Sequence, residues 1–145
     1  MAASLYICYF GLREPLVRTQ VIPYLRELAD AGHKIHLVTF EPEKKTNWTR
    51  EQIAAERADL ASVGIDWHCL AYHKRPSAIA TAYDVFVGSM FVRRFIKREQ
   101  IDILHGRVHV PMLMAALARR SSGRRPKLLF DIRGFFPEEY VDAGI

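Results

Sequence analysis

The sequence predicts an α/β fold, in which a Rossmann-like parallel sheet of about five strands carries helices on both of its faces. The main observation is that short apolar runs alternate along the chain with longer segments of helical periodicity. These runs are apolar at nearly every position, which is typical of strands that are buried on both faces of a parallel sheet. A length of 145 residues, half of them hydrophobic, suits a single domain with a substantial core.

The apolar runs place strands at residues 4–10, 34–40, 65–72, 102–104 and 128–130. Helical spacing places helices between them, at residues 17–31, 50–62, 77–99 and 111–120. Pro23 is expected to kink the first helix or to begin a second segment of it. Thr49 and Gln52 form a capping box at the start of the next helix. The helix at 77–99 is apolar on several sides, with Ile79 and Phe86 on one face, so we expect it to be buried on several sides.

Composition and charge limit the classes of function. A net charge of +5 and a pI near 9.4 permit an anionic partner without selecting one, and we expect no nucleic-acid partner. Cys8 and Cys69 form no metal or redox motif, and we expect two buried, reduced thiols and no cofactor. No apolar run spans a bilayer and no signal peptide is evident, so we expect a cytoplasmic protein. Several histidines are scattered, and none forms a zinc-ligand pair beside a third candidate: His33, His36, His68 and His73.

Ligands of open parallel sheets bind beyond the carboxyl ends of the strands, at the point where the strand order reverses. This rule selects four loops: 11–14, the loop after Phe40, 105–109 and 131–135. The first of them holds one glycine, Gly11, and therefore lacks the fingerprint of a classical dinucleotide site. Arg13 and Arg18 either meet an anion near the first helix or are solvated surface residues.

The motif HGRVH places His105, Arg107 and His109 at the end of the fourth strand. One interpretation is a histidine satisfied by neighbouring backbone, with the arginine in a surface ion pair. The other is a binding site, which the position at a strand end favours.

The motif FDIRG places Asp131, Arg133 and Gly134 at the end of the fifth strand. Residues two apart on an extended backbone point the same way, so Asp131 and Arg133 can form a local pair that fixes the turn. They can also form a polar floor on which a carboxylate binds hydroxyls and a guanidinium binds a phosphate or carboxylate. Gly134 is expected to provide a positive φ or a close approach.

A basic cluster stands near the end of the long helix, at Arg93, Arg94, Lys97 and Arg98, interleaved with Phe91, Phe95 and Ile96. It either contacts an anionic membrane surface or consists of cations that suit the dipole of a helix C-terminus. A second basic group, from Arg119 to Lys127, is expected at the opposite end of the sheet from the site and is interpreted as solvated surface.

Three stretches of the sequence resemble the N-terminal half of a GT-B fold glycosyltransferase, of the large retaining family four that uses nucleotide-sugar donors. They are TQVIPYLRELADAGHKIHLVTFE, IDILHGRVHVPMLMAALA and FDIRGFFPEEYVDAG, in the expected order and over most of the chain. The resemblance implies two Rossmann-like domains with the active site in the cleft between them. In such enzymes the N-terminal domain mainly binds the acceptor, the C-terminal domain binds the nucleotide sugar, and transfer needs no metal.

The resemblance also implies roles for individual residues. By position, Arg133 stands where many relatives carry a catalytic-site histidine, so an anion-binding or positioning role suits this arginine. His105 and Arg107 fall in the fourth-strand loop that lines the cleft, and Gly11 falls in the loop that approaches donor phosphates. The expected catalytic set is Arg133, Asp131 and His105, and the expected substrate-binding set is Gly11, Arg13, Arg107, His109 and Gly134.

Length leads to a further expectation, since residues 1–145 make one acceptor-side domain without the nucleotide-sugar domain. We therefore expect a truncated protein that is inactive alone, whose partners are a nucleotide-sugar donor held by the absent domain and a sugar or lipid acceptor. The alternative is a stand-alone α/β binding module that lost catalysis and pairs with a second copy through exposed apolar surface.

Overall fold

The protein is described here by a computed structural model, which describes residues 2–42, 48–72 and 78–132. Its strands are β1 (Ala3–Cys8), β2 (Lys34–Pro42), β3 (Ile65–Tyr72), β4 (Ile103–Arg107) and β5 (Lys127–Asp131). Its helices are a π-helical segment η1 (Val17–Val21), α1 (Ile22–Asp30), α2 (Arg50–Ser62), α3 (Ala78–Glu99) and α4 (His109–Ser122). Arg133 and Gly134 lie outside the described residues.

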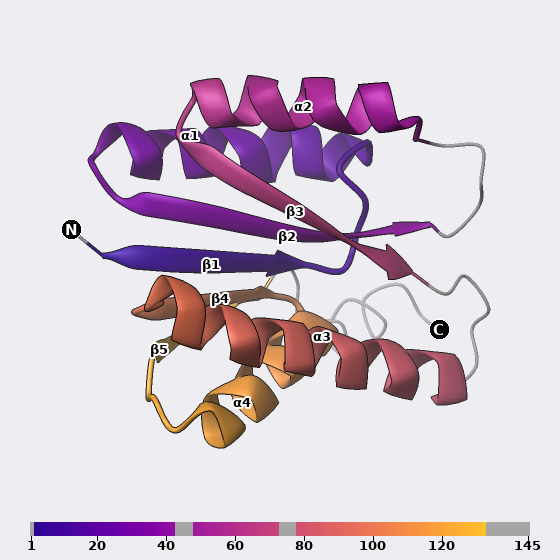
Figure 1. Cartoon of the computed structure of the whole chain (residues 1–145), viewed down its shortest axis with the longest axis vertical. Helices are drawn as coiled ribbons and strands as arrows, with labels where there is room; N and C mark the ends of the chain where they lie inside the picture. Colours follow the sequence, from indigo (N-terminus) through magenta and orange to yellow (C-terminus); the bar gives the residue numbers. More distant parts are fainter. Residues whose placement is uncertain (1, 43–47, 73–77, 133–145) are drawn as a thin grey trace, which may run out of the picture.

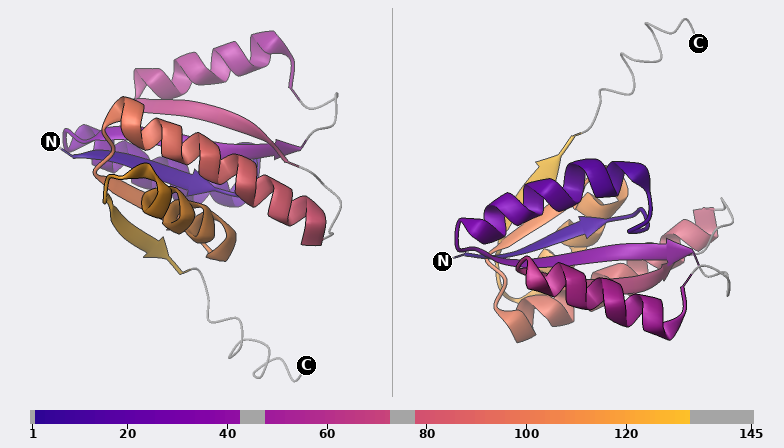
Figure 2. Two further views of the ribbon diagram at one scale, coloured as in Figure 1. Left: turned by 60° about the horizontal axis from the view of Figure 1, so that its bottom comes forward. Right: turned by 90° about the horizontal axis from the view of Figure 1, so that it is seen from above.

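The five described strands form one parallel sheet in the order β3-β2-β1-β4-β5 (Figure 1). The chain runs outward from β1 to β3 and then returns to place β4 on the other side of β1, so the strand order reverses between β1 and β4. Helices α1 and α2 lie on one face of the sheet and α3 and α4 lie on the other (Figures 1 and 2). The predicted Rossmann-like arrangement is therefore confirmed.

Each face of the sheet has its own apolar core, because nearly every strand position is apolar. The core under α1 and α2 is built around Tyr6, Leu37, Ile65 and Trp67, and the core under α3 and α4 around Leu5, Ile7, Val38, Phe40 and Met114. Alternate residues of one strand thus face opposite cores.

Two sequence signals at helix starts have the structure that they predict. Thr49 caps α2: its hydroxyl accepts from the Gln52 N–H at 3.1 Å, and the Gln52 side chain accepts from the Thr49 N–H at 3.0 Å. Pro23 stands in the first turn of α1, directly after the π-helical segment, so a second helical segment begins where the sequence predicts.

The predictions for β4 and α4 were too short. Strand β4 continues to Arg107, so His105 and Arg107 belong to the strand itself rather than to a loop after it, and α4 begins two residues early at His109. The helix can begin there because Val108 adopts φ 59° and turns the chain sharply between the two elements. A positive φ is costly for a β-branched residue.

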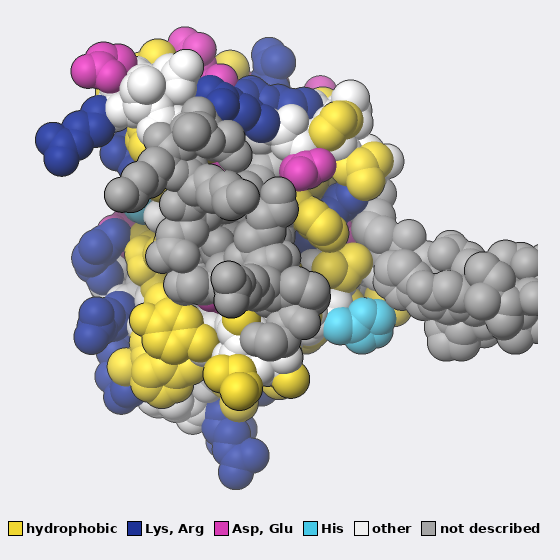
Figure 3. Space-filling view, turned by 90° about the vertical axis from the view of Figure 1, so that its right-hand side faces the viewer, with side chains coloured by type: hydrophobic (Ala, Val, Ile, Leu, Met, Phe, Trp, Pro, Cys, Tyr) yellow, Lys and Arg dark blue, Asp and Glu magenta, His cyan; other side chains and the backbone are white. Residues whose placement is uncertain are grey.

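The prediction that α3 is buried on several sides was wrong for one face of its first half, although Val85 in that half is buried. Ile79, Tyr83 and Phe86 are 83%, 55% and 65% exposed, whereas Val92 and Phe95 are buried. Figure 3 shows apolar side chains gathered on one part of the face toward which the strands point. Among the described residues, no helix is long and apolar enough to cross a membrane.

Candidate functional site

Polar side chains from neighbouring strands meet at the carboxyl edge of the sheet. Arg107 on β4 pairs in register with Asp131 on β5. Its guanidinium Nη1 lies 3.7 Å from Asp131 Oδ2, and His105 Nε2 lies 4.0 Å from the same oxygen. His105 and Arg107 are both buried. The structure therefore brings together three of the residues that the sequence singles out, and makes the arginine a member of an internal ion pair rather than a surface one.

Tyr6 is a fourth member of this group, and sequence analysis did not single it out. Its hydroxyl donates to Asp131 Oδ2 at 2.8 Å, and its ring lies 4.4 Å from that of His105, centroid to centroid. Burial is the main cause that raises the pKa of Tyr6, so the phenol stays protonated and remains a donor. A tyrosine among the apolar residues of a central strand was the available signal, because a buried hydroxyl needs a partner. Tyr6, His105, Arg107 and Asp131 are called the strand-end cluster below.

Arg107 keeps hydrogen-bonding capacity. Its Nη2 donates to Gln20 Oε1 at 3.0 Å, while Nη1, which is buried, has no hydrogen-bond partner among the described residues. Nη1 is within ion-pair distance of Asp131 but beyond hydrogen-bond distance. A buried guanidinium that is not fully hydrogen-bonded is costly unless a ligand completes its shell.

A cavity of about 260 Å³ opens beside the strand-end cluster and is lined by Tyr24, His105, Leu129, Phe130 and Asp131. An adjoining cavity of about 220 Å³ shares Tyr24, His105 and Leu129 with it. The two together form a groove between α1 and the strands β4 and β5. Its walls combine apolar surface with a few polar groups, the usual make-up of a small-molecule site.

His109 and Val108 connect this region to α4. His109 is exposed, and its ring contacts that of Phe130 edge-on at 5.4 Å. The backbone N–H of Val108 donates to the carbonyl of Asp131 at 3.0 Å, which ties the turn after β4 to the end of β5. The strained backbone of Val108 lies next to the strand-end cluster, and strain of this kind gathers at functional sites.

Gly11 and Arg13 lie in a different environment, close to the buried carboxylate of Glu41. A Cβ atom at Gly11 would come within 2.7 Å of Glu41 Oε2, so only glycine fits without a shift of that side chain. Arg13 lies over the ring of Trp48, 3.9 Å from its centroid, and donates to Gln52 Oε1 at 3.2 Å.

Glu41 organises the first loop through three hydrogen bonds. The backbone N–H of Leu12 and the hydroxyl of Thr39 both donate to its Oε1 at 2.8 Å, and the indole N–H of Trp48 donates to Oε2 at 3.0 Å. Arg18 pairs with Glu56 on the surface at 2.8 Å. In the described chain, the arginines near the first loop thus hold α2 against that loop.

The two basic groups show structural contacts. Arg98 pairs with Glu99 at 2.9 Å and lies over the ring of Phe95, while Arg119 donates to the carbonyl of Pro126 at 2.8 Å. Phe95 and Ile96, two of the apolar residues interleaved with the first group, are buried and thus pack inward rather than facing a membrane.

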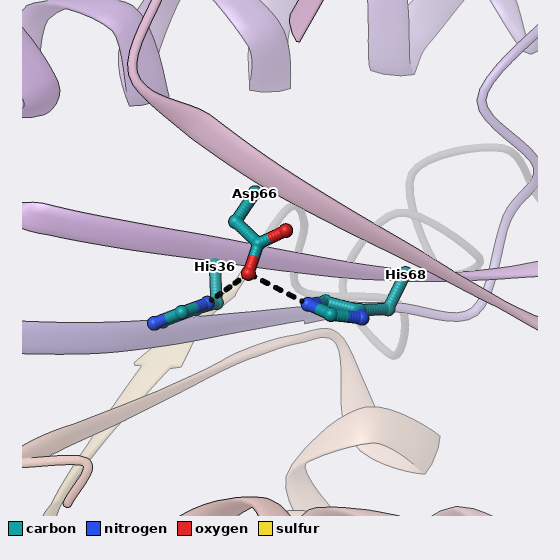
Figure 4. Close-up of side chains that lie close together, drawn as sticks. All are labelled: His36, Asp66 and His68. Carbon is teal, nitrogen blue, oxygen red and sulfur yellow. Dashed lines mark hydrogen bonds and ion pairs between the residues drawn. The ribbon is translucent and has the colours of Figure 1, made fainter. Parts of the chain in front are cut away.

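A second polar group was missed because its members lie far apart in the sequence. Asp66 Oδ2 lies 2.9 Å from His36 Nδ1 and 3.0 Å from His68 Nε2 (Figure 4). Sequence analysis treated these histidines as scattered. The parallel pairing that sets His36 opposite Asp66 brings them together.

No protein-family model matches the sequence, and no curated protein matches it. Solved structures resemble the fold. A glycosyltransferase from Rickettsia africae is 16% identical with a TM-score of 0.56, and the match covers 96% of this chain and 33% of that one. The calicheamicin glycosyltransferase CalG4 is 13% identical with a TM-score of 0.60, covering 99% of this chain and 37% of that one.

The C-terminal domain of a hydrogenase from Pyrococcus furiosus is also similar, at 13% identity and a TM-score of 0.58, covering 89% of this chain and 90% of that one. At these identities the likeness concerns the fold alone. The chain spans about one third of the length of the two glycosyltransferases that it resembles.

Proposed function

We propose that this chain is the acceptor-side domain of a glycosyltransferase that moves a sugar from a nucleotide-sugar donor to a glycan, lipid or small-molecule acceptor. The observation that carries the proposal is the strand-end cluster, which stands beside a cavity where the strand order reverses. The likeness in fold to two glycosyltransferases supports it, as does the resemblance of the sequence stretches around the cluster.

The chemistry of the cluster suits a hydroxylated ligand. Asp131 accepts hydrogen bonds from acceptor hydroxyl groups, and His105 lies beside it as the group that exchanges a proton with the reacting hydroxyl. Arg107 Nη1 offers a charged donor to a phosphate or carboxylate on the ligand. The apolar walls at Tyr24 and Leu129 suit the C–H face of a sugar ring.

The remaining predicted residues keep their roles as proposals. Arg133 positions an anionic group and Gly134 permits its close approach, while His109 forms the rim of the groove. Gly11 and Arg13 face the donor phosphates from the first loop. The donor itself is bound by a second domain, so this chain alone binds an acceptor without transferring sugar.

Calorimetric titration of the chain tests the acceptor-side role. Methyl glycosides such as methyl α-glucoside and methyl α-mannoside serve as acceptor probes, and UDP-glucose and GDP-mannose serve as donor probes. The proposal expects glycosides or glycoside oligomers to bind and nucleotide sugars to bind at least about tenfold more weakly. Preferential binding of nucleotide sugars, or sugar transfer by this chain alone, would contradict it.

The second candidate is a stand-alone module that associates with another copy of itself. The exposed side chains of Ile79, Tyr83 and Phe86 favour it, because neighbouring apolar side chains on one helix mark interfaces. Sedimentation equilibrium tests it: Phe86→Ser should weaken a dimer, whereas Leu16→Ser, at a leucine elsewhere that is 56% exposed, should not. A monomer at all accessible concentrations would remove this candidate.

We also propose that the protein is cytoplasmic and contacts a membrane surface peripherally through the basic cluster at residues 93–98. Since Phe95 is buried, such contact would be electrostatic and would weaken with added salt. Co-sedimentation with phosphatidylglycerol vesicles tests it, and unchanged binding after replacement of the four cations by glutamine would refute it.

A further inference from the structure

We propose that His36, Asp66 and His68 form a binding site for a divalent transition metal ion, with Zn²⁺ as the preferred occupant. One donor atom from each of these residues lies within 4.8 Å of the others. The site is independent of the strand-end cluster, because His36 and His68 pack against Phe95 of α3 whereas Tyr6 belongs to the core on the opposite face of the sheet.

The sheet itself creates the site. His36 on β2 stands directly opposite Asp66 on β3, and His68 follows Asp66 by two residues and therefore points to the same face. Figure 4 shows the three side chains converging from these two strands, with both imidazoles directed at one carboxylate oxygen. Nothing needs to move in the backbone for the three donors to meet.

The spacing is close to that of a bound metal. The two imidazole nitrogens lie 2.9 and 3.0 Å from Asp66 Oδ2. Donor atoms bound to tetrahedral zinc at about 2.0–2.1 Å lie about 3.3 Å apart, so small side-chain rotations admit the ion. Two imidazoles and one carboxylate suit zinc and leave a fourth position for water.

Aromatic residues of α3 pack against the two histidines on one side of the proposed site, and the other side is open to solvent. The rings of His36 and His68 both meet Phe95 edge-on, at 4.9 and 4.8 Å between centroids, and Phe91 stacks on Phe95 behind them. This aromatic wall from α3 fixes the planes of the two imidazoles. Asp66 has 53% of its side chain exposed, so an ion and a water ligand can enter from solvent.

Without an ion, hydrogen bonds hold the three side chains together. Both rings share one carboxylate oxygen of Asp66, which has two lone pairs with which to accept them. A metal ion would replace these hydrogen bonds with coordination bonds from His36 Nδ1, His68 Nε2 and Asp66. The bound ion would join the outer strand β3 to β2 beneath α3 and raise the resistance of this edge to unfolding.

Titration of the metal-free, untagged chain with ZnCl₂ tests the proposal. We expect one ion per chain, a thermal midpoint that rises with zinc and falls back with EDTA, and at least a tenfold loss of affinity in His68→Asn and in Asp66→Asn. His33→Asn, which alters an exposed histidine outside the site, should bind as the wild type does. Absence of zinc binding by the wild type, wild-type affinity in either site variant, or loss of binding in His33→Asn would overturn the assignment.

X-ray absorption on the zinc-loaded wild type needs no variant and decides the matter if the variants fail to fold. The proposal requires imidazole scattering from two rings, with zinc–nitrogen distances of about 2.0–2.1 Å. A spectrum with water and carboxylate oxygens alone would overturn it.

Discussion

Asp131 is the residue on which the strand-end cluster depends, because both Tyr6 and Arg107 direct polar groups at its Oδ2 atom. Asp131→Ala leaves the buried Arg107 guanidinium without its carboxylate. We expect the free energy of unfolding to fall by about 2–4 kcal/mol, since removing one partner of a buried pair leaves the other charge buried and unpaired.

Urea denaturation measures this loss, and Glu56→Ala is the matched control because Glu56 pairs with Arg18 at the surface. The control should cost at most about 1 kcal/mol. Equal losses of unfolding free energy in the two variants would show that the internal ion pair stabilises the fold no more than the surface pair does.

We expect Cys8 to make the free energy of unfolding depend on pH. Burial raises the pKa of its thiol from 9.0 to about 11, so between these values the unfolded chain releases a proton that the folded chain retains. The protonated Cys8 thiol therefore contributes fully to the free energy of unfolding below pH 9. This contribution, about 2–3 kcal/mol in total, is lost as pH rises toward 11.

Denaturation curves from pH 8 to pH 10.5 test this, with Cys8→Val as the comparison because valine fills the site without titrating. The variant should lose less stability over the range than the wild type. Parallel curves would mean that Cys8 does not cause the dependence.

Among the elements, α2 has the start that local sequence determines most clearly. Thr49→Ala removes the hydroxyl that accepts from the Gln52 N–H, and we expect a loss of about 1 kcal/mol in the free energy of unfolding. Thr19→Ala is the control, because the Thr19 hydroxyl donates to the carbonyl of Pro15 within an exposed helical turn. A loss in the control as large as in Thr49→Ala would argue against the cap.

The features that could be predicted from the sequence are those that depend on neighbouring residues, as the cap of α2 does. The capping box and Pro23 were predictable because their signals lie within a few residues of their effects. The exposure of Ile79 and Phe86 was not, since helical periodicity shows which side chains share a face but not what packs on it. The early start of α4 depends on the positive φ of Val108, which no residue preference predicts.

At the scale of the whole molecule, the predictable part of the candidate site was its position. Alternating elements predict a parallel sheet, and a parallel sheet places the ends of β4 and β5 side by side, which brings Arg107 to Asp131. Register was not predictable, so Tyr6 was overlooked and the convergence of His36 with Asp66 was missed. Both arise from which residue of one strand stands opposite which residue of the next.

The central claim is that the strand-end cluster and its groove bind a sugar. Amide NMR spectra of the chain titrated with methyl glycosides test it most directly, with Arg107→Met as the site variant and Arg18→Met as the surface control. The account predicts shifts concentrated at residues 24, 105–107 and 129–131, lost in Arg107→Met and retained in Arg18→Met. Shifts that gather elsewhere, or that persist unchanged in Arg107→Met, would contradict it.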